Sequence, residues 1–348
     1  MHPAEPRLSV VVVTHNEADA ITGSLPPLVA ELRDGDELIV VDNGSTDGSP
    51  EIVAAAAPDS RVVRNTDNRG FMAAVNAGAR EAGGDLLVLL NPDAVVQPGW
   101  REGIAKPWTE DYGWSAWQGL VTTDEGRHVN SDGNVIHFTG ICWAGGVGED
   151  ITSAGAQPRE VPYASGACLA VPLALWLDLD GFPEYFFLYG DDVDISLRLR
   201  LRGERIGIEP SARVDHDYVF DKGKRKWRFL ERSRWAFLIR TYPAPLLVLT
   251  MPALLATEVA LLPISAASGW LPQKLLANLD VLRWAPRLLA ERREIQRRRL
   301  IGTAPFAAWL TADLTSPYLG AAAQSNLLRS LLRIYLGAMR IVLGRAQP

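Results

Sequence analysis

The chain has 348 residues, enough for one large domain with an appendage or for two domains. Apolar residues make up 47% and charged residues 22%, a composition that excludes an intrinsically disordered chain. Two cysteines, Cys142 and Cys168, cannot build a disulfide framework and fit a reducing cytosol. The first residues carry no basic segment and only a short apolar run, so we expect no signal peptide.

The formal net charge of −6 conceals two halves of opposite sign. Residues 1–220 contain 15 Lys and Arg against 34 Asp and Glu, whereas residues 221–348 contain 20 against 7. The acidic half argues against nucleic acid as its partner, and the basic, apolar half suggests an anionic membrane surface. We therefore predict two domains, 1–220 and 221–348, with different partners.

The first ninety residues alternate between short apolar runs and helical segments. This alternation with short connections predicts an α/β fold with a mostly parallel sheet and helices on both faces. The helix nearest the N-terminus is expected to be interrupted near Pro26 and Pro27. The predicted strands cover 8–13, 36–43, 60–65 and 85–90, and the predicted helices cover 17–33, 49–57 and 70–82.

Polar residues follow three of these strands at the point where each strand ends. Ligands of parallel sheets bind beyond the carboxyl ends of the strands, so we expect these residues to share one rim. Asp42 fits a contact to a base or a ribose, whereas Asp93 fits either a metal ligand or a simple turn. The three groups are Thr14 to Glu17, Asp42 with Asn43, and Asn91 to Asp93.

The region from residue 100 to residue 220 is less regular. We expect irregular strands and loops over 100–165, which either shape a substrate cleft with five tryptophans or form a stabilising insertion. A helix over 189–203 begins with Asp191, Asp192 and Asp194, where a carboxylate could act as a general base or only offset the helix dipole. Residues 204–220 predict two short extended runs and include His216, which fits a metal ligand or a structural histidine.

The last third of the chain differs in composition, because it is richer in basic and apolar residues. Residues 221–240 predict a strongly basic helix. Residues 241–273 contain one charge, Glu258, and are interrupted by Pro243, Pro245, Pro252 and Pro263. A re-entrant or interfacial helical hairpin therefore fits this segment better than one clean span. Residues 324–344 predict an amphipathic helix with its arginines on one face. Residues 221–348 as a whole are expected to form either a membrane-docking region or a soluble helical cap.

Six motifs appear together and in order: "VVVVTHNE", "LIVVDNGSTDGS", "NRGFMAAVNAGAREAGGDLLVLLNPDAVV", "SGACLAV", "FFLYGDDVDISLRLRLRG" and "ARVDH". In this the chain resembles the inverting family-2 glycosyltransferases of the GT-A fold, in particular their rhamnosyltransferase branch. The resemblance covers roughly residues 8–220. The sequence departs from the family pattern at two positions. Asn91 stands where the first Asp of an Asp-x-Asp element is usual, and Asp191 stands where Glu is usual.

The resemblance implies a role for each matching residue. Asp42 would recognise the base, Asp93 and His216 would bind Mg²⁺ or Mn²⁺, and Asp192 would be the general base with Asp191 beside it. The nucleotide-sugar would be contacted by Thr14, Asn16, Glu17, Asp42, Asn43, Asn68, Gly70, Asn76, Asn91 and Asp93.

The implied activity is inverting transfer of a sugar, with dTDP-rhamnose as the first guess, to a hydroxyl of a saccharide or polyprenyl-linked saccharide. Such a reaction belongs to cell-wall or surface polysaccharide synthesis, at the cytoplasmic face of the cell membrane. Two alternatives remain: a sugar-1-phosphate nucleotidylyltransferase, and a catalytically inactive membrane-associated scaffold. A nucleotidylyltransferase would require a Gly-rich loop with Arg or Lys after the first strand. This chain has "THNEADA" at that position, which argues against the first alternative.

Overall fold

The computed structural model describes residues 5–217, 222–316 and 325–345. The chain divides into two compact units. The first comprises 1–134, 144–196 and 205–218, and the second comprises 135–143, 197–204 and 219–348. The predicted domain boundary at residue 220 lies outside the described residues, and two short segments of the predicted first domain group with the second unit.

The first ninety residues form the alternating strands and helices that the sequence predicts. Their strands are apolar and almost fully buried, apart from β3 at the edge of the sheet. The elements are β1 (Leu8–Thr14), α1 (Ala18–Glu31), β2 (Glu37–Asn43), α2 (Ser49–Ala56), β3 (Arg61–Asn65), α3 (Phe71–Glu81) and β4 (Leu86–Leu90).

One helix in this region differs from its prediction. α1 runs without interruption through Pro26 and Pro27, although each proline removes a backbone donor. Its buried residues Ile21, Leu25 and Leu28 follow the helical spacing and belong to the main core. Packing of this stripe on the sheet therefore holds the helix together where local propensity would end it.

Residues 91–172 are more regular than predicted. They include α4 (Trp100–Thr109), which the sequence analysis missed, and β6 (Ala116–Thr123), a buried strand in the middle of the sheet. Trp100 and Trp117 are fully buried core residues, so these two tryptophans do not line a cleft. The other strands are β5 (Val95–Val96), β7 (His128–Ser131), β8 (Asn134–Ile136), β9 (Cys142–Ala144), β10 (Arg159–Glu160) and β11 (Cys168–Pro172).

The first unit is completed by α5 (Leu173–Asp178), the first turns of α6 (Asp191–Leu201) and β12 (Ile206–Asp215). Two short 3₁₀ segments, η1 (Ile151–Ser153) and η2 (Glu184–Phe186), lie in the connections. β12 is one strand with an irregular register between Glu209 and Arg213, where the sequence predicted two separate runs. The irregularity explains the apparent break, because a bulge interrupts the pattern of alternation while the pairing continues.

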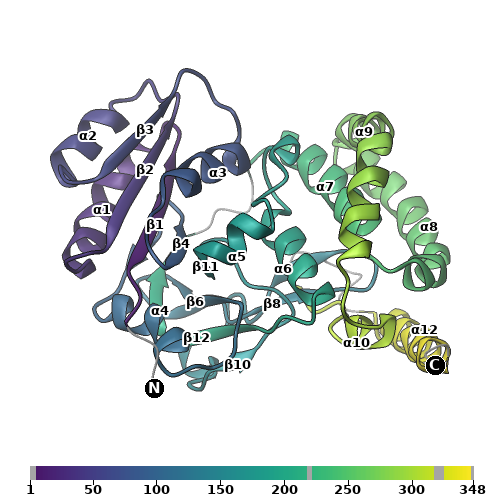
Figure 1. Ribbon diagram of the computed structural model, residues 1–348. Helices are drawn as coiled ribbons and strands as arrows, with labels where there is room; N and C mark the ends of the chain where they lie inside the picture. Colours follow the sequence, from purple (N-terminus) through teal and green to yellow (C-terminus); the bar gives the residue numbers. More distant parts are fainter. Residues whose placement is uncertain (1–4, 218–221, 317–324, 346–348) are drawn as a thin grey trace. The chain divides into compact units, whose positions relative to one another are not determined.

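The main sheet has the order β10-β12-β6-β11-β4-β1-β2-β3, with β5 paired to β12 and β7 to β6. β4, β1, β2 and β3 are parallel, and β11 enters antiparallel between β4 and β6. α1 and α2 lie on one side of β1–β3 and α3 on the other (Figure 1). Thr14 lies opposite Asp42 in the register, which brings the ends of β1 and β2 to one rim as predicted.

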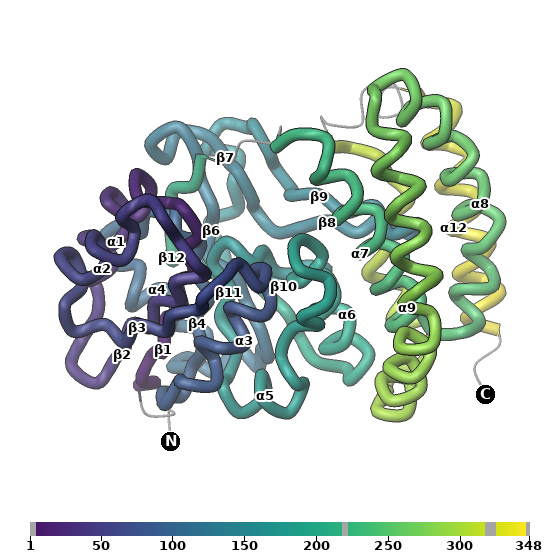
Figure 2. The backbone as a smooth tube through the Cα atoms, turned by 90° about the horizontal axis from the view of Figure 1, so that it is seen from above, coloured from purple at the N-terminus to yellow at the C-terminus, as the bar shows by residue number. Residues whose placement is uncertain are grey.

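The second unit is helical. Its elements are α7 (Arg225–Thr241), α8 (Ala244–Ala267), α9 (Leu271–Arg297), α10 (Thr303–Ala307) and α12 (Asn326–Arg345). α9 contacts both α7 and α8, α8 also contacts α12, and Figure 2 shows these helices side by side. Among the described residues, α8 is the one helix long and apolar enough to cross a membrane.

α8 corrects the prediction for residues 241–273. It is one continuous helix through Pro252 and Pro263, and the turn falls after it, at Ser268–Trp270, before α9 begins. Its buried positions Leu246, Thr250 and Leu254 recur every four residues, so the helix packs along one narrow stripe. The helical hairpin is therefore α8 with α9, not a hairpin inside 241–273.

A buried cluster of charges joins α7, α8 and α9. Lys274 Nζ lies 2.6 Å from Glu231 Oε2 and 2.7 Å from Glu258 Oε2, and its side chain is fully buried. Arg234 pairs with both Glu231 and Glu258, and Trp235 Nε1 donates a hydrogen bond to Glu258. Burial alone would raise the pKa of Glu231, but the charges of Arg234 and Lys274 hold it below its usual value. The single charge of the apolar helix is thus neutralised from two neighbouring helices.

Candidate active site at the carboxyl ends of the strands

Asp42 stands at the end of β2 with its side chain buried. Its Oδ1 accepts a hydrogen bond from the Ser45 backbone N–H at 3.0 Å. The hydroxyl of neighbouring Thr14 is buried and has no hydrogen-bond partner within the described residues. Gly44 has φ of +80°, and a Cβ there would come within 2.8 Å of the Asp67 backbone, so the turn requires glycine. A carboxylate and a spare hydroxyl therefore meet at this rim.

Asn16 and Glu17 belong to the connection that follows β1. The Asn16 backbone N–H donates to Ser45 Oγ at 3.1 Å, and Asn16 Oδ1 accepts from the Thr46 N–H at 2.8 Å. The Glu17 N–H donates to Ser49 Oγ at 3.3 Å. These hydrogen bonds hold the loop after β1 against the loop after β2, so Asn16 and Glu17 lie beside Asp42.

Asn43 organises the next loop. Its Oδ1 accepts from Asn65 Nδ2 at 2.9 Å and from the Arg69 N–H at 3.1 Å. Its Nδ2 donates to Asn68 Oδ1 at 3.0 Å and to the Gly70 carbonyl at 3.3 Å. The side chain of Asn43 is buried, and all of its polar atoms are thus used within the protein. Asn43 and Asn68 set the path of the loop that leads into α3.

Asn76 lies on α3 and is bound to a distant segment. Its Nδ2 donates to the Phe182 carbonyl at 2.9 Å and to Glu184 at 3.2 Å, and its Oδ1 accepts from the Phe182 N–H at 2.9 Å. A Cβ at Gly181 would collide with Asn76 Oδ1, so the chain fits closely around this amide. In this structure Asn76 clamps the segment before α6 to α3.

Asp93 and His216 come together although 123 residues separate them in the chain. His216 Nε2 lies 3.0 Å from Asp93 Oδ1 and 3.5 Å from Asn91 Nδ2. His216 is fixed by its backbone, whose N–H donates to the Thr122 carbonyl at 2.8 Å and whose carbonyl accepts from Asn130 Nδ2 at 2.8 Å. The imidazole is almost fully buried, whereas the Asp93 side chain is about one-third exposed.

The pair fits a divalent cation in its donor chemistry. A carboxylate oxygen and an imidazole nitrogen at one point suit Mn²⁺, and a carboxylate also suits Mg²⁺. Among the described residues no group of three or more His, Cys, Asp or Glu side chains could hold a metal by itself. The protein therefore offers a two-ligand site that an oxygen-rich ligand would have to complete.

Asp191 and Asp192 open α6. The Oδ2 of Asp192 accepts from the Gly166 N–H at 3.3 Å, and its Oδ1 lies 2.8 Å from the Val193 N–H. Burial raises the pKa of Asp192 from 3.8 to about 6, against the lowering effect of these N–H groups. Burial also raises the pKa of Asp191 well above its usual value, and the neighbouring charges of Asp192 and Asp194 add to it. A half-buried carboxylate with a raised pKa is suited to proton transfer near neutral pH.

A short segment connects the carboxylate pair with the Asp93 and His216 pair. The Asn91 N–H donates to the Ala167 carbonyl at 3.1 Å, where β11 begins its antiparallel pairing with β4. The backbone N–H of Gly166, the residue before Ala167, donates to Asp192. The side-chain amide of Asn91 lies 3.5 Å from the His216 ring. The structure thus brings the predicted base and the predicted metal ligands to the same end of β4.

A second connection joins the α3 loop to the start of α6. The Phe187 carbonyl accepts from the Phe71 N–H at 2.8 Å, and a Cβ at Gly70 would come within 2.6 Å of the Phe187 ring. Phe187 has φ of +71° and ψ of −52°, and the Leu188 N–H donates to the Phe186 carbonyl at 2.9 Å. This is a γ-turn with positive φ, a rare and strained conformation for a non-glycine residue.

Gly166 and Phe187 are the residues that sequence reasoning missed. Both lie in motifs that were recognised, "SGACLAV" and "FFLYGDD", but the motifs gave no reason to single out either residue. Two signals in the sequence could have identified these residues. One is the glycine just before β11, and the other is the aromatic stretch that precedes Asp191 and Asp192.

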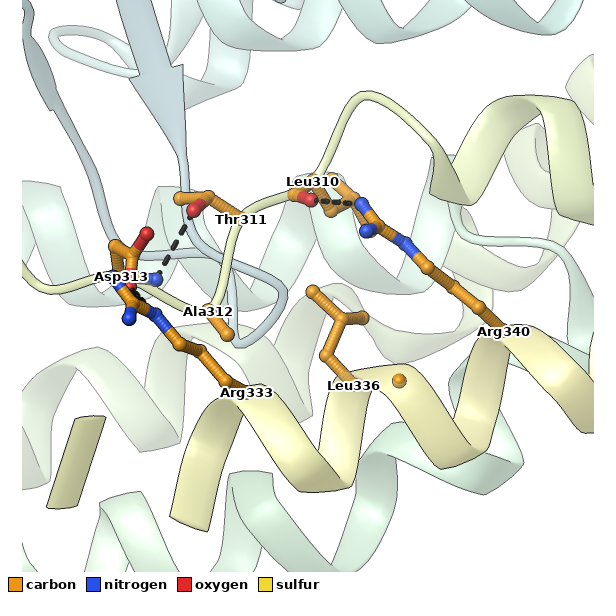
Figure 3. Close-up of a pocket in the computed structure, with 8 residues that line it drawn as sticks. Leu310, Thr311, Ala312, Asp313, Arg333, Leu336 and Arg340 are labelled. Carbon is orange, nitrogen blue, oxygen red and sulfur yellow. Dashed lines mark hydrogen bonds and ion pairs between the residues drawn. The ribbon is translucent and has the colours of Figure 1, made fainter. Parts of the chain in front are cut away.

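A small pocket of about 230 Å³ lies in the second unit, between residues 310–313 and α12 (Figure 3). The two arginines that line it already have partners: Arg333 pairs with Asp313, and Arg340 donates to the Leu310 carbonyl at 2.7 Å. None of the predicted site residues lines it.

Sequence comparison finds relatives of this chain among sugar-transferring enzymes. Residues 9–142 match the family model described as Glycosyl transferase family 2. The chain is 27% identical over 245 residues to an N-acetylglucosaminyl-diphospho-decaprenol L-rhamnosyltransferase of Mycobacterium tuberculosis, covering 62% of this chain and 78% of that protein. It is 33% identical over 99 residues to an undecaprenyl-phosphate 4-deoxy-4-formamido-L-arabinose transferase of Yersinia pestis, covering 26% and 30%.

Solved structures share the fold at low sequence identity. GalNAc-T7, solved with UDP, GalNAc and Mn²⁺, superposes with a TM-score of 0.57 at 16% identity, covering 69% of this chain and 49% of that one. TarS of S. aureus superposes with a TM-score of 0.51 at 17% identity, covering 97% and 54%. These likenesses show the GT-A fold that the sequence analysis expected.

Proposed function

We propose that this chain, whose residues 9–142 match the family model of glycosyl transferase family 2, is an inverting glycosyltransferase with Asp192 as its base. The donor is a nucleotide-diphosphate sugar, with dTDP-rhamnose as the first choice. The acceptor is a hydroxyl of a saccharide or of a polyprenyl-linked saccharide, in cell-wall or surface polysaccharide synthesis. The donor is suggested by the rhamnosyltransferase relative and the lipid-linked acceptor by both relatives.

The observation that carries the proposal is the meeting of two pairs at the end of β4. Asp191 and Asp192 provide a carboxylate with a raised pKa, and Asp93 with His216 provides the cation ligands. The Ser165–Ala167 segment touches both pairs through Gly166 and Asn91. These contacts support the proposal that proton acceptance and leaving-group binding share one site.

The residues have distinct roles in the proposed reaction. Asp42 binds the base, with Thr14 beside it, and the loop set by Asn43 and Asn68 holds the sugar-diphosphate portion. Asp93 and His216 would hold Mg²⁺ or Mn²⁺, which supplies positive charge to the diphosphate leaving group when bound. Asp192 takes the proton of the acceptor hydroxyl. The hydroxyl oxygen forms its bond to the anomeric carbon from the face opposite the diphosphate, while the bond from that carbon to the diphosphate oxygen breaks and the nucleoside diphosphate leaves, which inverts the configuration.

We further propose that the second unit docks on the anionic cytoplasmic face of the cell membrane. Its excess of Lys and Arg and the apolar α8 support this placement. Docking would bring a lipid-linked acceptor to the enzyme.

A binding screen tests the donor. We expect one nucleotide-sugar, dTDP-rhamnose before others, to raise the melting temperature of the purified chain by mass action, and to do so more strongly with Mn²⁺. That donor should then support transfer to a polyprenyl-diphosphate saccharide. Release of diphosphate from a nucleoside triphosphate and a sugar-1-phosphate would instead indicate a nucleotidylyltransferase. Absence of any stabilisation would favour the inactive scaffold.

Removal of one cation ligand tests the metal site. His216→Ala is expected to raise the Mn²⁺ concentration required for half-maximal donor stabilisation by about 10- to 100-fold, because one of two protein ligands is lost. The measurement is the shift in melting temperature at fixed donor over a series of Mn²⁺ concentrations. His128→Ala, an exposed histidine elsewhere in the unit, is the matched control. An unchanged Mn²⁺ requirement in His216→Ala would remove His216 from the site.

A further inference from the structure

We propose that α8 lies in the plane of one membrane leaflet and does not cross the bilayer. Its buried face packs against the other helices of the second unit, and its exposed face contacts lipid. This inference rests on the docking part of the proposed function and specifies its geometry. It goes beyond the length and composition of α8, which would equally allow a membrane span.

The position of Glu258 argues against a span. It is the fifteenth of the 24 residues of α8, so a crossing helix would carry this carboxylate close to the middle of the bilayer. An ionisable side chain there is costly unless it is paired. Its partners, Lys274 and Arg234, are on α9 and α7, and they would have to accompany it.

α9 cannot accompany α8 through a membrane. Between Lys274 and Arg297 it carries nine charged side chains, among them Asp280, which pairs with Arg228 and Arg232 of α7. Since α8 and α9 are joined by a short turn and share the buried cluster, α8 remains with α9. The hairpin as a whole can rest on a membrane but not traverse it.

The outer face of α8 is suited to lipid. Val248, Leu255, Val259 and Leu262 follow a spacing of seven, four and three residues, which places them on one face opposite the buried stripe. Val248 and Val259 are about 70% and 67% exposed. A soluble protein rarely leaves a continuous apolar stripe of this kind open to water.

Two neighbouring helices repeat the pattern. On α9 the exposed leucines are Leu275, Leu279, Leu282 and Leu289, and on α12 the exposed residues are Leu327, Leu331, Ile334 and Ile341. Both sets recur at intervals of four, three and seven residues, so each helix has one apolar outer face. On α12 the opposite face is buried through Leu336, Met339 and Leu343.

Basic side chains indicate lipid, not another protein, as the occupant of these faces. Arg329, Arg333 and Arg340 fall on one flank of α12, between its buried face and its exposed face. Figure 3 shows Arg333 and Arg340 rising from α12 toward residues 310–313. Arg333 pairs with Asp313 and Arg340 donates to the Leu310 carbonyl, but residues 221–348 carry 20 Lys and Arg against 7 Asp and Glu, and this excess of positive charge suits an anionic leaflet. Self-association would instead bring the like charges of two copies together.

Labelling from each side of a membrane tests the orientation of α8. Single cysteines replace Ala244, at the start of α8, and Ser268, just after its end, both in an exposed position. The background is the full chain with Cys142→Ala. Cys168 remains, because it is buried and burial raises the pKa of its thiol to about 11, which keeps it unreactive. A membrane-impermeant maleimide is added to spheroplasts and to inverted inner-membrane vesicles.

The in-plane arrangement predicts that both cysteines react in inverted vesicles and that neither reacts in spheroplasts. Reaction of one cysteine in each preparation would show that α8 crosses, which overturns this inference while docking stands. Recovery of the chain only in the soluble fraction would overturn docking itself. The failures of the two proposals are therefore distinguishable.

A pair of matched variants tests the lipid face directly. Val259→Glu is expected to lower the fraction bound to vesicles of phosphatidylcholine and phosphatidylglycerol by at least about tenfold, since burial of one Val stabilises by roughly 1.5 kcal/mol or more. Leu177→Glu, at an exposed leucine of the first unit, should bind as the unaltered chain does. Equal binding of the Val259 variant would overturn the proposal, and a change only in its oligomeric state would assign the face to a second copy of the chain.

Discussion

Replacement of Asp192 by Asn is expected to lower kcat for sugar transfer by about 10²- to 10⁴-fold, the range that one general base contributes. The amide keeps the size of the side chain but cannot accept the proton of the acceptor hydroxyl. The donor-induced rise in melting temperature should remain, because Asp192 is not one of the proposed donor ligands. The measurement is the rate of transfer with the donor that the binding screen identifies.

The pH dependence gives this prediction a second readout. Because the pKa of Asp192 is raised to about 6, the carboxylate is protonated below that pH and cannot act as a base. Transfer by the unaltered chain should therefore fall as the pH drops through about 6, and the inflection belongs to the Asp191 and Asp192 pair. Asp192→Asn should lose that inflection. Asp59→Asn, at an exposed position, is the control, and retention of near-normal kcat in Asp192→Asn would refute the assignment of the base.

Replacement of Lys274 by Met is expected to lower the free energy of unfolding of the second unit by about 3–5 kcal/mol, the usual cost of leaving a buried charge unpaired. Lys274 is fully buried and contacts Glu231 and Glu258, so its loss leaves Arg234 as the remaining cation of the cluster. Chemical denaturation followed by tryptophan fluorescence measures the change. A loss below about 1 kcal/mol would mean that the cluster is neutralised in another way.

The control for Lys274→Met is Arg283→Met on the same helix. Arg283 is largely exposed, and its nitrogen lies 3.9 Å from Asp280, so its loss should cost less than about 1 kcal/mol. Combining Lys274→Met with Glu258→Gln should restore part of the lost stability, because the amide removes one unpaired charge. The combination distinguishes a charge effect from a packing effect.

The parallel half of the fold was predictable because its signals are local. β1, β2 and β4 are short apolar runs that give way to polar residues at Thr14, Asp42 and Asn91, and the helices that follow β1, β2 and β3 begin within a few residues. Parallel pairing then requires the strand ends to share a rim, which is why Asp42 and Asn91 were identified without coordinates. The contact between Asp93 and His216, 123 residues apart in the chain, came from the resemblance, and the structure provides its geometry.

The incorrect helix predictions have one physical cause. α4 contains Gly103 and Pro107, and α1 and α8 contain internal prolines, all of which weaken local helix propensity. Burial of one stripe on each helix outweighs that weakness, and tertiary burial is not visible in a short sequence window. The cluster around Glu258 was invisible for a similar reason, because its partners lie on two other helices.

The γ-turn at Phe187 links two parts of the site that are more than a hundred residues apart in the chain. Because Gly70 has no room for a Cβ beside the Phe187 ring, the loop into α3 and the lead-in to Asp191 and Asp192 can change only together. Substitutions at these two places are therefore coupled in their effects. Among relatives that accept different sugars, the residues at positions 70 and 187 should therefore change together. Replacing only one of the two should lower transfer activity by more than replacing both.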